Sequence, residues 1–299
     1  MTTDAPEMKI GALAPWFGGN RTLAATVGRV MGRIDWCGVV FTGGAPELPH
    51  LNCRAGVAND LHCHLINMAR VVRDELLVER MIGLVDDMLF HPVEYAEAQA
   101  RCVAREAAWP PVPEGGLFGA APAAFCTTVM PDVRWAADYF ACCWMGRGGS
   151  AGQENEFAQQ LAMRWTPTGG SSAKRWRSAV ESLRAWNRAL RHWEFTRLDA
   201  FEFLAQVKDM KGVALYVDAP WPDAGERYEH KFTTADQVRL AARLAAFRNV
   251  RIVVRFGDHP LIRDLYQGGR GQWTWIEQES RNQQGNGVAE VLIVNGGVA

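Results

Sequence analysis

The chain lacks an excess of charge of either sign, and it lacks any long apolar run. It carries 32 Lys or Arg against 33 Asp or Glu, a net charge of −1 over 299 residues. This balance excludes a strongly basic, histone-like binder, and a hydrophobic content of 48% excludes a disordered chain. No segment approaches the ~20 apolar residues that a membrane-spanning helix needs, and the polar start does not resemble a secretory leader. We expect a soluble globular protein that binds no membrane.

Cysteine and tyrosine are scarce. Seven Cys at irregular spacing in a chain of this length argue against a disulfide framework and predict reduced thiols in a cytosolic protein. We expect the neighbours Cys142 and Cys143 to be buried core thiols. Only five Tyr accompany twelve Trp. Most of this Trp excess falls between residues 109 and 193, where large apolar side chains compensate for a thin helical core.

Three common catalytic or metal patterns are absent or incomplete. No G-x-x-x-x-G-K-[ST] phosphate loop exists, which removes support for an ATPase. His62, Cys63 and His64 are adjacent, but neighbouring helical residues diverge by about 100°, and no second Cys/His pair has zinc-finger spacing. We therefore expect no metal. Residues 148–152 match G-x-S-x-G, with Asp258 and His259 following, yet no strand directly precedes the serine, so a nucleic-acid-contacting loop is favoured over a hydrolase.

Short apolar runs alternate with helical periodicity along much of the chain. Strands are predicted at residues 39–42, 56–59, 214–218, 250–256, 273–276 and 290–294, and a helix at 235–247. This alternation predicts an α/β fold with a mostly parallel sheet that binds ligands at the carboxyl ends of its strands. The alternation stops in a segment rich in Ala, Trp and Arg. We predict a catalytic domain of residues 1–85 and 195–299, interrupted by a mainly helical subdomain of residues 86–194.

The inserted segment ends in a basic stretch. Residues 164–197 contain eight Lys or Arg against two acids. On a helical wheel, one face carries Trp176, Val180, Leu183, Trp186, Leu190 and Trp193. An adjoining stripe predicts contacts with DNA phosphates by Lys174, Arg175, Arg177, Arg184, Arg188 and Arg191. The alternative is a solvated Arg face on a helix whose Trp residues are simply core.

The tetrapeptide Asp218-Ala219-Pro220-Trp221 follows an apolar run and precedes a second proline. It therefore predicts a rigid turn at the carboxyl end of a strand. The Asp218 carboxylate and the Ala219 carbonyl can both accept hydrogen bonds from an exocyclic amine, while the Trp221 ring stacks on the base that carries it. Such a turn by itself is more often structural than catalytic, so its context matters.

Glycine-rich turns in the N-terminal half supply that context. Pro15 to Asn20 precede a helix-like stretch, Phe41-Thr42-Gly43-Gly44 follows an apolar run, and Asn59-Asp60 ends the next one. Glycines directly after a strand let a cofactor approach the backbone, and an acid at the end of the second strand is placed to bind ribose hydroxyls.

The order of these pieces resembles the DNA N6-adenine methyltransferases of the Dam type. Residues 14–23 look like that family's Pro-Trp-x-Gly-Gly-Lys opening, 57–72 like its Asn-Asp helix, and 218–295 follow it to its end. The resemblance implies a Rossmann-like sheet that binds S-adenosylmethionine, an inserted target-recognition subdomain, and duplex DNA with a flipped adenine as substrate. The implied donor-binding residues are Trp16, Phe17, Gly18, Gly19, Asn20, Phe41, Gly43, Gly44, Asn59, Asp60, Asp199 and Phe201.

The chain departs from the family pattern at four positions. Ala219 stands in place of Pro and Trp221 in place of Tyr or Phe, but the carbonyl and the stacking ring survive both changes. Asn20 replaces the usual Lys, and Val39 stands where the family has an acid. We expect an active methyltransferase in a bacterial cytoplasm, encoded by a bacterium or a phage. A weak or inactive DNA-binding relative, or an enzyme that uses a modified sulfonium donor, is the alternative.

Overall fold

The structure is a computed structural model that describes residues 11–19, 21–107, 130–147, 150–163, 170–222, 232–267, 273–281 and 287–295. Its centre is a mixed seven-stranded sheet in the order β3-β2-β1-β4-β5-β7-β6. The predicted α/β fold is therefore confirmed at this level. Within the described ranges, no helix is long and apolar enough to cross a membrane.

Six of the seven strands in the described sheet run in the same direction, and β7 runs in the opposite direction. β1 (Ile34–Val39) lies between β2 (Cys53–Asn59) and β4 (Val213–Val217), and β3 (Trp193–Thr196) pairs with the outer side of β2. β5 (Arg251–Gly257) follows β4 in parallel. β7 (Gly287–Asn295) is antiparallel to both β5 and the edge strand β6 (Trp273–Arg281). The carboxyl ends of β1, β2 and β4 therefore meet at one edge of the sheet.

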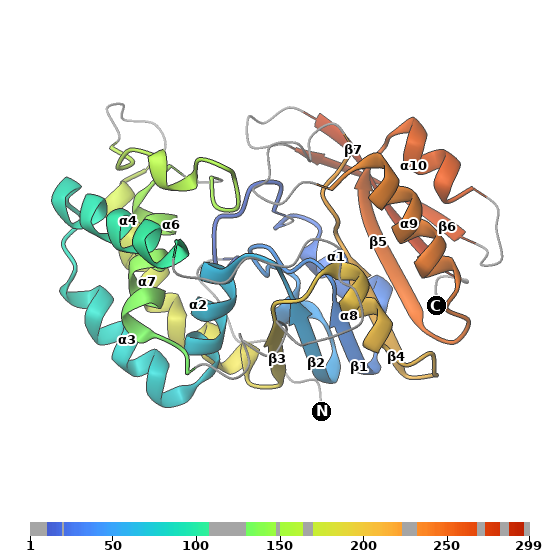
Figure 1. Ribbon diagram of the computed structural model, residues 1–299, viewed down its shortest axis with the longest axis horizontal. Helices are drawn as coiled ribbons and strands as arrows, with labels where there is room; N and C mark the ends of the chain where they lie inside the picture. Colours follow the sequence, from blue (N-terminus) through green and yellow to red (C-terminus); the bar gives the residue numbers. More distant parts are fainter. Residues whose placement is uncertain are drawn as a thin grey trace.

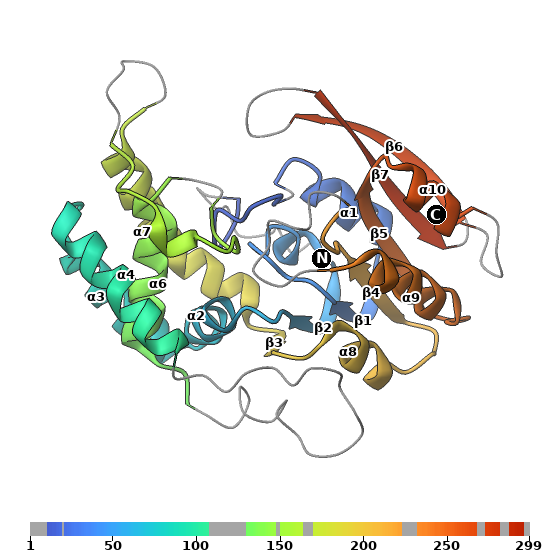
Figure 2. The same ribbon diagram turned by 45° about the horizontal axis from the view of Figure 1, so that its top comes forward.

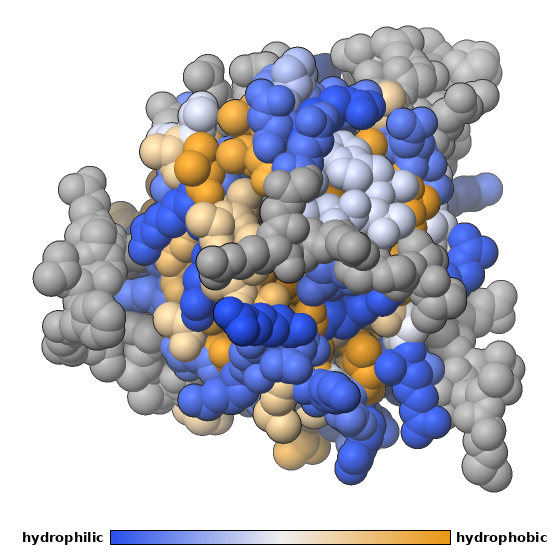
Figure 3. Space-filling model, turned by 90° about the vertical axis from the view of Figure 1, so that its right-hand side faces the viewer, coloured by the Kyte–Doolittle hydropathy of each residue, from blue (hydrophilic) through white to orange (hydrophobic). Residues whose placement is uncertain are grey.

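Both faces of the sheet are covered, because its central strands are apolar on both sides. Ala214 and Tyr216 of β4 pack into one hydrophobic cluster, and Leu215 and Val217 pack into the other. The first cluster includes α1 (Ala24–Met31). The second includes α8 (Ala200–Gln206), α9 (Thr234–Ala245) and α10 (Pro260–Leu265). The face of the molecule that carries α9, α10 and β6 mixes hydrophilic and hydrophobic residues (Figure 3).

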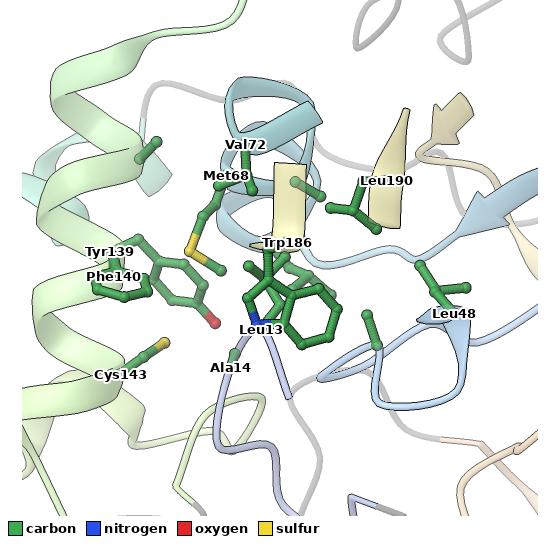
Figure 4. Packing of buried hydrophobic residues seen from close by; sticks show 14 of the residues in the cluster. Leu13, Ala14, Leu48, Met68, Val72, Tyr139, Phe140, Cys143, Trp186 and Leu190 are labelled. Carbon is green, nitrogen blue, oxygen red and sulfur yellow. The ribbon is translucent and has the colours of Figure 1, made fainter. Parts of the chain in front are cut away.

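A group of helices lies beyond the β3 edge of the sheet (Figures 1 and 2). It consists of α2 (Cys63–Arg73), α3 (Glu75–Asp87), α4 (Pro92–Glu106), α6 (Val133–Met145) and α7 (Ser172–Leu190). Nine of the eleven residues of α2 are buried, because this helix lies against β3 and also contacts α6 and α7. Figure 4 shows Met68 of α2, Tyr139 of α6 and Trp186 of α7 converging on Leu13 near the chain start.

The helical group begins earlier than predicted. α2 and α3 pack against α6 and α7, so the predicted boundary at residue 86 falls within α3. The other boundary falls within β3. Trp193, predicted on the helix face, is instead the first residue of β3, and Arg191 follows the last turn of α7. The sequence signal for this strand is the alternation of the apolar Trp193 and Phe195 with polar residues. In the structure both aromatic side chains are buried, as expected for alternate residues of a strand.

Most predicted strands match the structure within a few residues. The exception is the prediction at residues 39–42, which was wrong, because β1 ends at Val39 and the apolar residues that follow it enter the loop. β1 itself contains Asp35 and Gly38, which weakened its apolar signal. The Pro/Gly-rich residues 109–122 lie outside the described residues.

Candidate active site

The strand order reverses direction between β1 and β4. From β1 the chain builds β2 and β3 on one side, and then crosses to build β4 and β5 on the other. In parallel α/β sheets, such a switch point opens a crevice at the carboxyl ends of the strands, where ligands bind. Gly43, Asp60 and Asp218 follow β1, β2 and β4 respectively, so all three predicted turns belong to this edge.

Asp60 joins the loops after β1 and β2. Its carboxylate accepts hydrogen bonds from the Gly43 amide at 2.8 Å and from the His62 amide at 3.0 Å. Gly43 has a φ of +48°, a left-handed conformation that glycine adopts without a steric penalty. The two bonds orient both carboxylate oxygens, and each oxygen keeps acceptor capacity for a further donor.

Asn59 supports the same edge from inside. Its side chain is buried; its amide nitrogen donates to the carbonyls of Val40 and Leu198, and its oxygen accepts from the Thr196 hydroxyl and the Leu198 amide. These bonds tie the ends of β1, β2 and β3 together. The predicted donor-binding role of Asn59 therefore reduces to holding the loop that carries Asp60, because its amide has no free hydrogen-bonding group to offer a ligand.

Trp16 forms a half-buried wall beside the β1 loop. Cβ atoms built at Gly43 or Gly152 would lie 2.9 Å and 2.4 Å from its ring, so both positions require glycine. Residues 150–152 reach this wall from beyond α6, and the Phe17 amide donates to the Ala151 carbonyl. Gly18 and Gly19 continue this turn in exposed positions, while Asn20 lies outside the described residues.

Three half-buried phenyl rings lie together at the same edge. Phe232, which precedes α9, packs edge-on against Phe41 at 5.5 Å and lies parallel to Phe201 at 6.3 Å between ring centroids. Asp199 begins α8 and accepts a hydrogen bond from the Phe201 amide through one oxygen. The arrangement brings an apolar aromatic wall and a carboxylate to one place. Phe232 was missed as a site residue because it lies far along the chain from the other two rings.

Asp218 is held by a buried arginine. Arg255 Nη1 donates to Asp218 Oδ2 at 2.7 Å, and Arg255 Nε donates to Glu290 Oε2 at 2.7 Å. The Tyr216 hydroxyl lies 3.5 Å from Asp218 Oδ2 and 3.2 Å from Glu47 Oε1. The turn after β4 thus ends in a buried network of one cation and three carboxyl groups that sequence analysis did not identify. The available signal was Arg255 itself, a lone charge within an apolar strand.

Burial changes the charge states in this network. It raises the pKa of the Asp218 carboxyl above its ordinary value, while the Arg255 guanidinium acts in the opposite direction. Burial, with the nearby charge of Asp218, raises the pKa of Glu47 to about 8. The Arg255 pKa is raised, because the neighbouring carboxylates outweigh the burial that lowers it. At neutral pH, Glu47 is therefore protonated and can share a hydrogen bond with Tyr216.

The rest of the tetrapeptide is fixed from two sides. The Pro220 carbonyl accepts a hydrogen bond from the buried Gln237 of α9 at 2.6 Å. The half-buried Trp221 lies over Gly257, where a Cβ would come within 2.8 Å of its ring, and its ring centroid is 5.0 Å from the Arg255 guanidinium carbon. Among the described residues, no group donates to the carbonyl of the buried Ala219, which leaves that acceptor available.

The predicted basic stripe on α7 is largely neutralised by α3. Arg184 makes a two-bond ion pair with Glu79, at 2.8 and 2.7 Å. Arg177 and Arg191 each make a single ion-pair contact, with Asp86 at 3.2 Å and with Glu75 at 3.4 Å respectively. Arg175 donates to the carbonyls that end α6. Within the described part of the chain, only Lys174 and Arg188 of the six predicted phosphate contacts have a side chain without a partner.

The predicted structural roles of the other motifs agree with their contacts. Asp258 makes a two-bond ion pair with Arg263, and His259 caps α10, so neither is free to act with Ser150. His62 Nε2 lies 3.1 Å from the buried Glu156, and His64 Nδ1 accepts a hydrogen bond from Trp135. No cluster of three or more His, Cys, Asp or Glu in the described ranges is arranged to hold a metal ion.

The sequence matches no model of a known protein family, and a search of curated proteins finds no significant match. The functional argument therefore rests on the arrangement of the site.

Proposed function

We propose that the protein is an S-adenosylmethionine-dependent methyltransferase that methylates the N6 amine of adenine in DNA. The observation that carries the proposal is the meeting of two turns at the switch point. The Gly43–Asp60 pair after β1 and β2 provides a nucleoside-binding edge, and the Asp218 turn after β4 provides acceptors for an amine.

The strand order supports the proposed Rossmann-like fold. A parallel set in the order β3-β2-β1-β4-β5, with a final antiparallel strand inserted between β5 and β6, is the arrangement typical of S-adenosylmethionine-dependent methyltransferases. The helical group beyond β3 is the proposed target-recognition subdomain. Because its helix α2 lies against β3, we take this subdomain to share its core with the catalytic sheet.

The residues at this edge fit a nucleoside-containing donor. The phenyl rings of Phe41, Phe201 and Phe232 would form an apolar wall for adenine, and the carboxylates of Asp60 and Asp199 would accept hydrogen bonds from hydroxyl and amine groups of the donor. Gly18 and Gly19 let the N-terminal turn approach a ligand closely. When bound, S-adenosylmethionine would supply a methyl group attached to a positively charged sulfur, which is a good leaving group for transfer of the methyl group to the amine.

The Asp218 turn would prepare the amine for attack. The lone pair of adenine N6 is delocalised into the ring, so the amine is a weak nucleophile. Hydrogen bonds to Asp218 and to the Ala219 carbonyl draw its hydrogens out of the ring plane and localise the lone pair. Asp218 then accepts the proton that the methylated nitrogen releases. Trp221 would stack on the flipped base, which replaces part of the stacking energy lost from the duplex.

The DNA would reach this site along the helical group, with duplex DNA in a bacterial cytoplasm as the substrate. Lys174 and Arg188 are the basic side chains on α7 that remain available for phosphates. Arg177, Arg184 and Arg191 already have acidic partners on α3 and would contribute less.

The test measures transfer of a labelled methyl group from S-adenosylmethionine to adenine-containing duplex DNA. We expect label in N6-methyladenine, and we expect Asp218→Ala to lose transfer by at least ~100-fold. Asp258→Ala, which removes an acid at the carboxyl end of β5, serves as the matched control and should keep transfer. No transfer by the unmodified protein at saturating donor and DNA would refute the enzymatic proposal.

Donor binding is measured separately by thermal unfolding. S-adenosylmethionine at ~100-fold excess over its Kd should stabilise the fold by about 2.7 kcal/mol. Stabilisation without transfer would favour the alternative of an inactive methyltransferase-fold protein that binds DNA. If neither thermal stabilisation nor methyl transfer is observed, S-adenosylmethionine is excluded as the donor.

A further inference from the structure

We propose that Arg255 is the positioning residue of this site, which aligns the catalytic acid, the stacking ring and the donor-binding turn around one buried guanidinium. The inference rests on the proposed function and assigns Arg255 a role in it. Arg255 comes from β5, a strand that carries none of the residues assigned so far to the reaction.

One side chain touches all three parts. Arg255 Nη1 donates to Asp218 Oδ2 at 2.7 Å and to the Gly18 carbonyl at 3.1 Å. The guanidinium carbon lies 5.0 Å from the ring centroid of Trp221. These contacts link the turn after β4 to the N-terminal glycine turn, two segments about 200 residues apart in the chain. Displacement of the guanidinium would therefore disturb the acid, the ring and the donor turn together.

Glu290 fixes the guanidinium from the other side. Its Oε2 accepts from Arg255 Nε at 2.7 Å, and the side chains of both residues are almost fully buried, 5% exposed for Arg255 and 8% for Glu290. A buried cation needs such partners, because its desolvation is costly unless hydrogen bonds and opposite charges compensate. The planar guanidinium satisfies Glu290, Asp218 and Gly18 at once, whereas the compact ammonium group of lysine lacks this rigid geometry.

The contact between Arg255 and Asp218 also controls the charge of the Asp218 carboxyl. Four charged or titratable groups face Asp218: Arg255 from β5, Glu290 from β7, Tyr216 from β4 and Glu47 from the loop after β1. Only Arg255 carries a positive charge. Removal of Arg255 would leave a largely buried carboxyl beside Glu290, and burial then favours the protonated form. A protonated Asp218 no longer accepts a proton from the amine, so Arg255 keeps the acid in its reactive state.

The experiment compares Arg255→Met and Arg255→Lys in the full-length protein by two readouts. Carbon-13 NMR of the labelled Asp218 carboxyl measures its titration directly, without reference to activity. We expect its pKa to rise clearly in Arg255→Met and to stay near that of the unmodified protein in Arg255→Lys. Arg263→Met removes an exposed Arg–Asp pair at the end of the same strand and serves as the matched control, with Asp218 unchanged.

The second readout is the pH profile of methyl transfer. Arg255→Met should lower kcat by about 100-fold at neutral pH and move the acidic limb to higher pH, with partial recovery in alkaline buffer. Arg255→Lys should keep the position of that limb but still lose turnover, because the Gly18 contact requires the guanidinium. If Arg255→Met does not fold, Arg255→Gln, which is also neutral but keeps a polar side chain, takes its place in both measurements.

An unchanged Asp218 titration in Arg255→Met would overturn the inference. Lost turnover of Arg255→Met with an unshifted pH profile would overturn it as well, because that result indicates a purely structural role. If the unmodified protein transfers no methyl group, the proposed function fails while the NMR titration still decides whether Arg255 controls Asp218.

Discussion

Gly56 of β2 lies directly against the indole of Trp193 in β3. The two residues are register partners across the parallel pair, and a Cβ built at Gly56 would lie 2.3 Å from the Trp193 ring. Trp193 is fully buried. The absence of a side chain at Gly56 therefore leaves the space that the Trp193 ring occupies. Because β3 directly follows α7, this packing also fixes the end of the helical group against the sheet.

Gly56→Ala should destabilise the fold by about 2 kcal/mol, because the new methyl group overpacks against Trp193. The free energy of unfolding in urea measures this change. Gly83→Ala is the matched control, since a Cβ at Gly83 on α3 meets no atom within 4 Å and the helix should gain ~0.5–1 kcal/mol. Equal stability of the two variants would contradict the packing described for Trp193.

Glu47 should make the fold less stable as pH rises. Its pKa in the folded protein is raised to about 8 from an ordinary value near 4.5, chiefly by burial, so between these values the folded state binds more protons than the unfolded state. The free energy of unfolding then falls with increasing pH, by at most ~1.4 kcal/mol per pH unit from this group.

Glu47→Gln removes this titration while keeping an acceptor for the Tyr216 hydroxyl. We expect a flatter stability profile between pH 5 and pH 8 and the largest relative gain at the alkaline end. Glu277→Gln, at an exposed acid of β6, should leave the profile unchanged. A profile of Glu47→Gln that parallels that of the unmodified protein would show that Glu47 does not retain its proton.

Two arginines on α7 should differ in their contribution to DNA binding. Arg188 has no acidic partner in the described chain, whereas Arg184 is paired with Glu79. Arg188→Ala should lower the slope of log Kd against log salt by about 1, the loss of one phosphate contact, and Arg184→Ala should lower it less. Salt-dependent DNA binding measured by fluorescence anisotropy checks this. Slopes of both variants that equal the slope of the unmodified protein would remove α7 from the proposed DNA surface.

The sequence predicted the α/β class and five strands of the sheet because these depend on local patterns. Apolar runs of the right length, such as those of β4 and β5, report burial on both faces of a sheet. The glycine and acid turns were also predictable, since a turn after a strand has its own residue preferences. The short strand β3 was missed because it follows α7 after only two residues, and the helical pattern masked it.

Residue type and spacing by themselves determined which residues are able to take part in chemistry at this site, with Asp60 and Asp218 as the main examples. Only the tertiary structure decided what those residues face. It paired Asp218 with Arg255 and Glu290, and it paired the arginines of α7 with acids of α3. The physical reason is that charge and burial at one atom depend on groups distant in sequence, whereas strand and turn formation depends on neighbours along the chain.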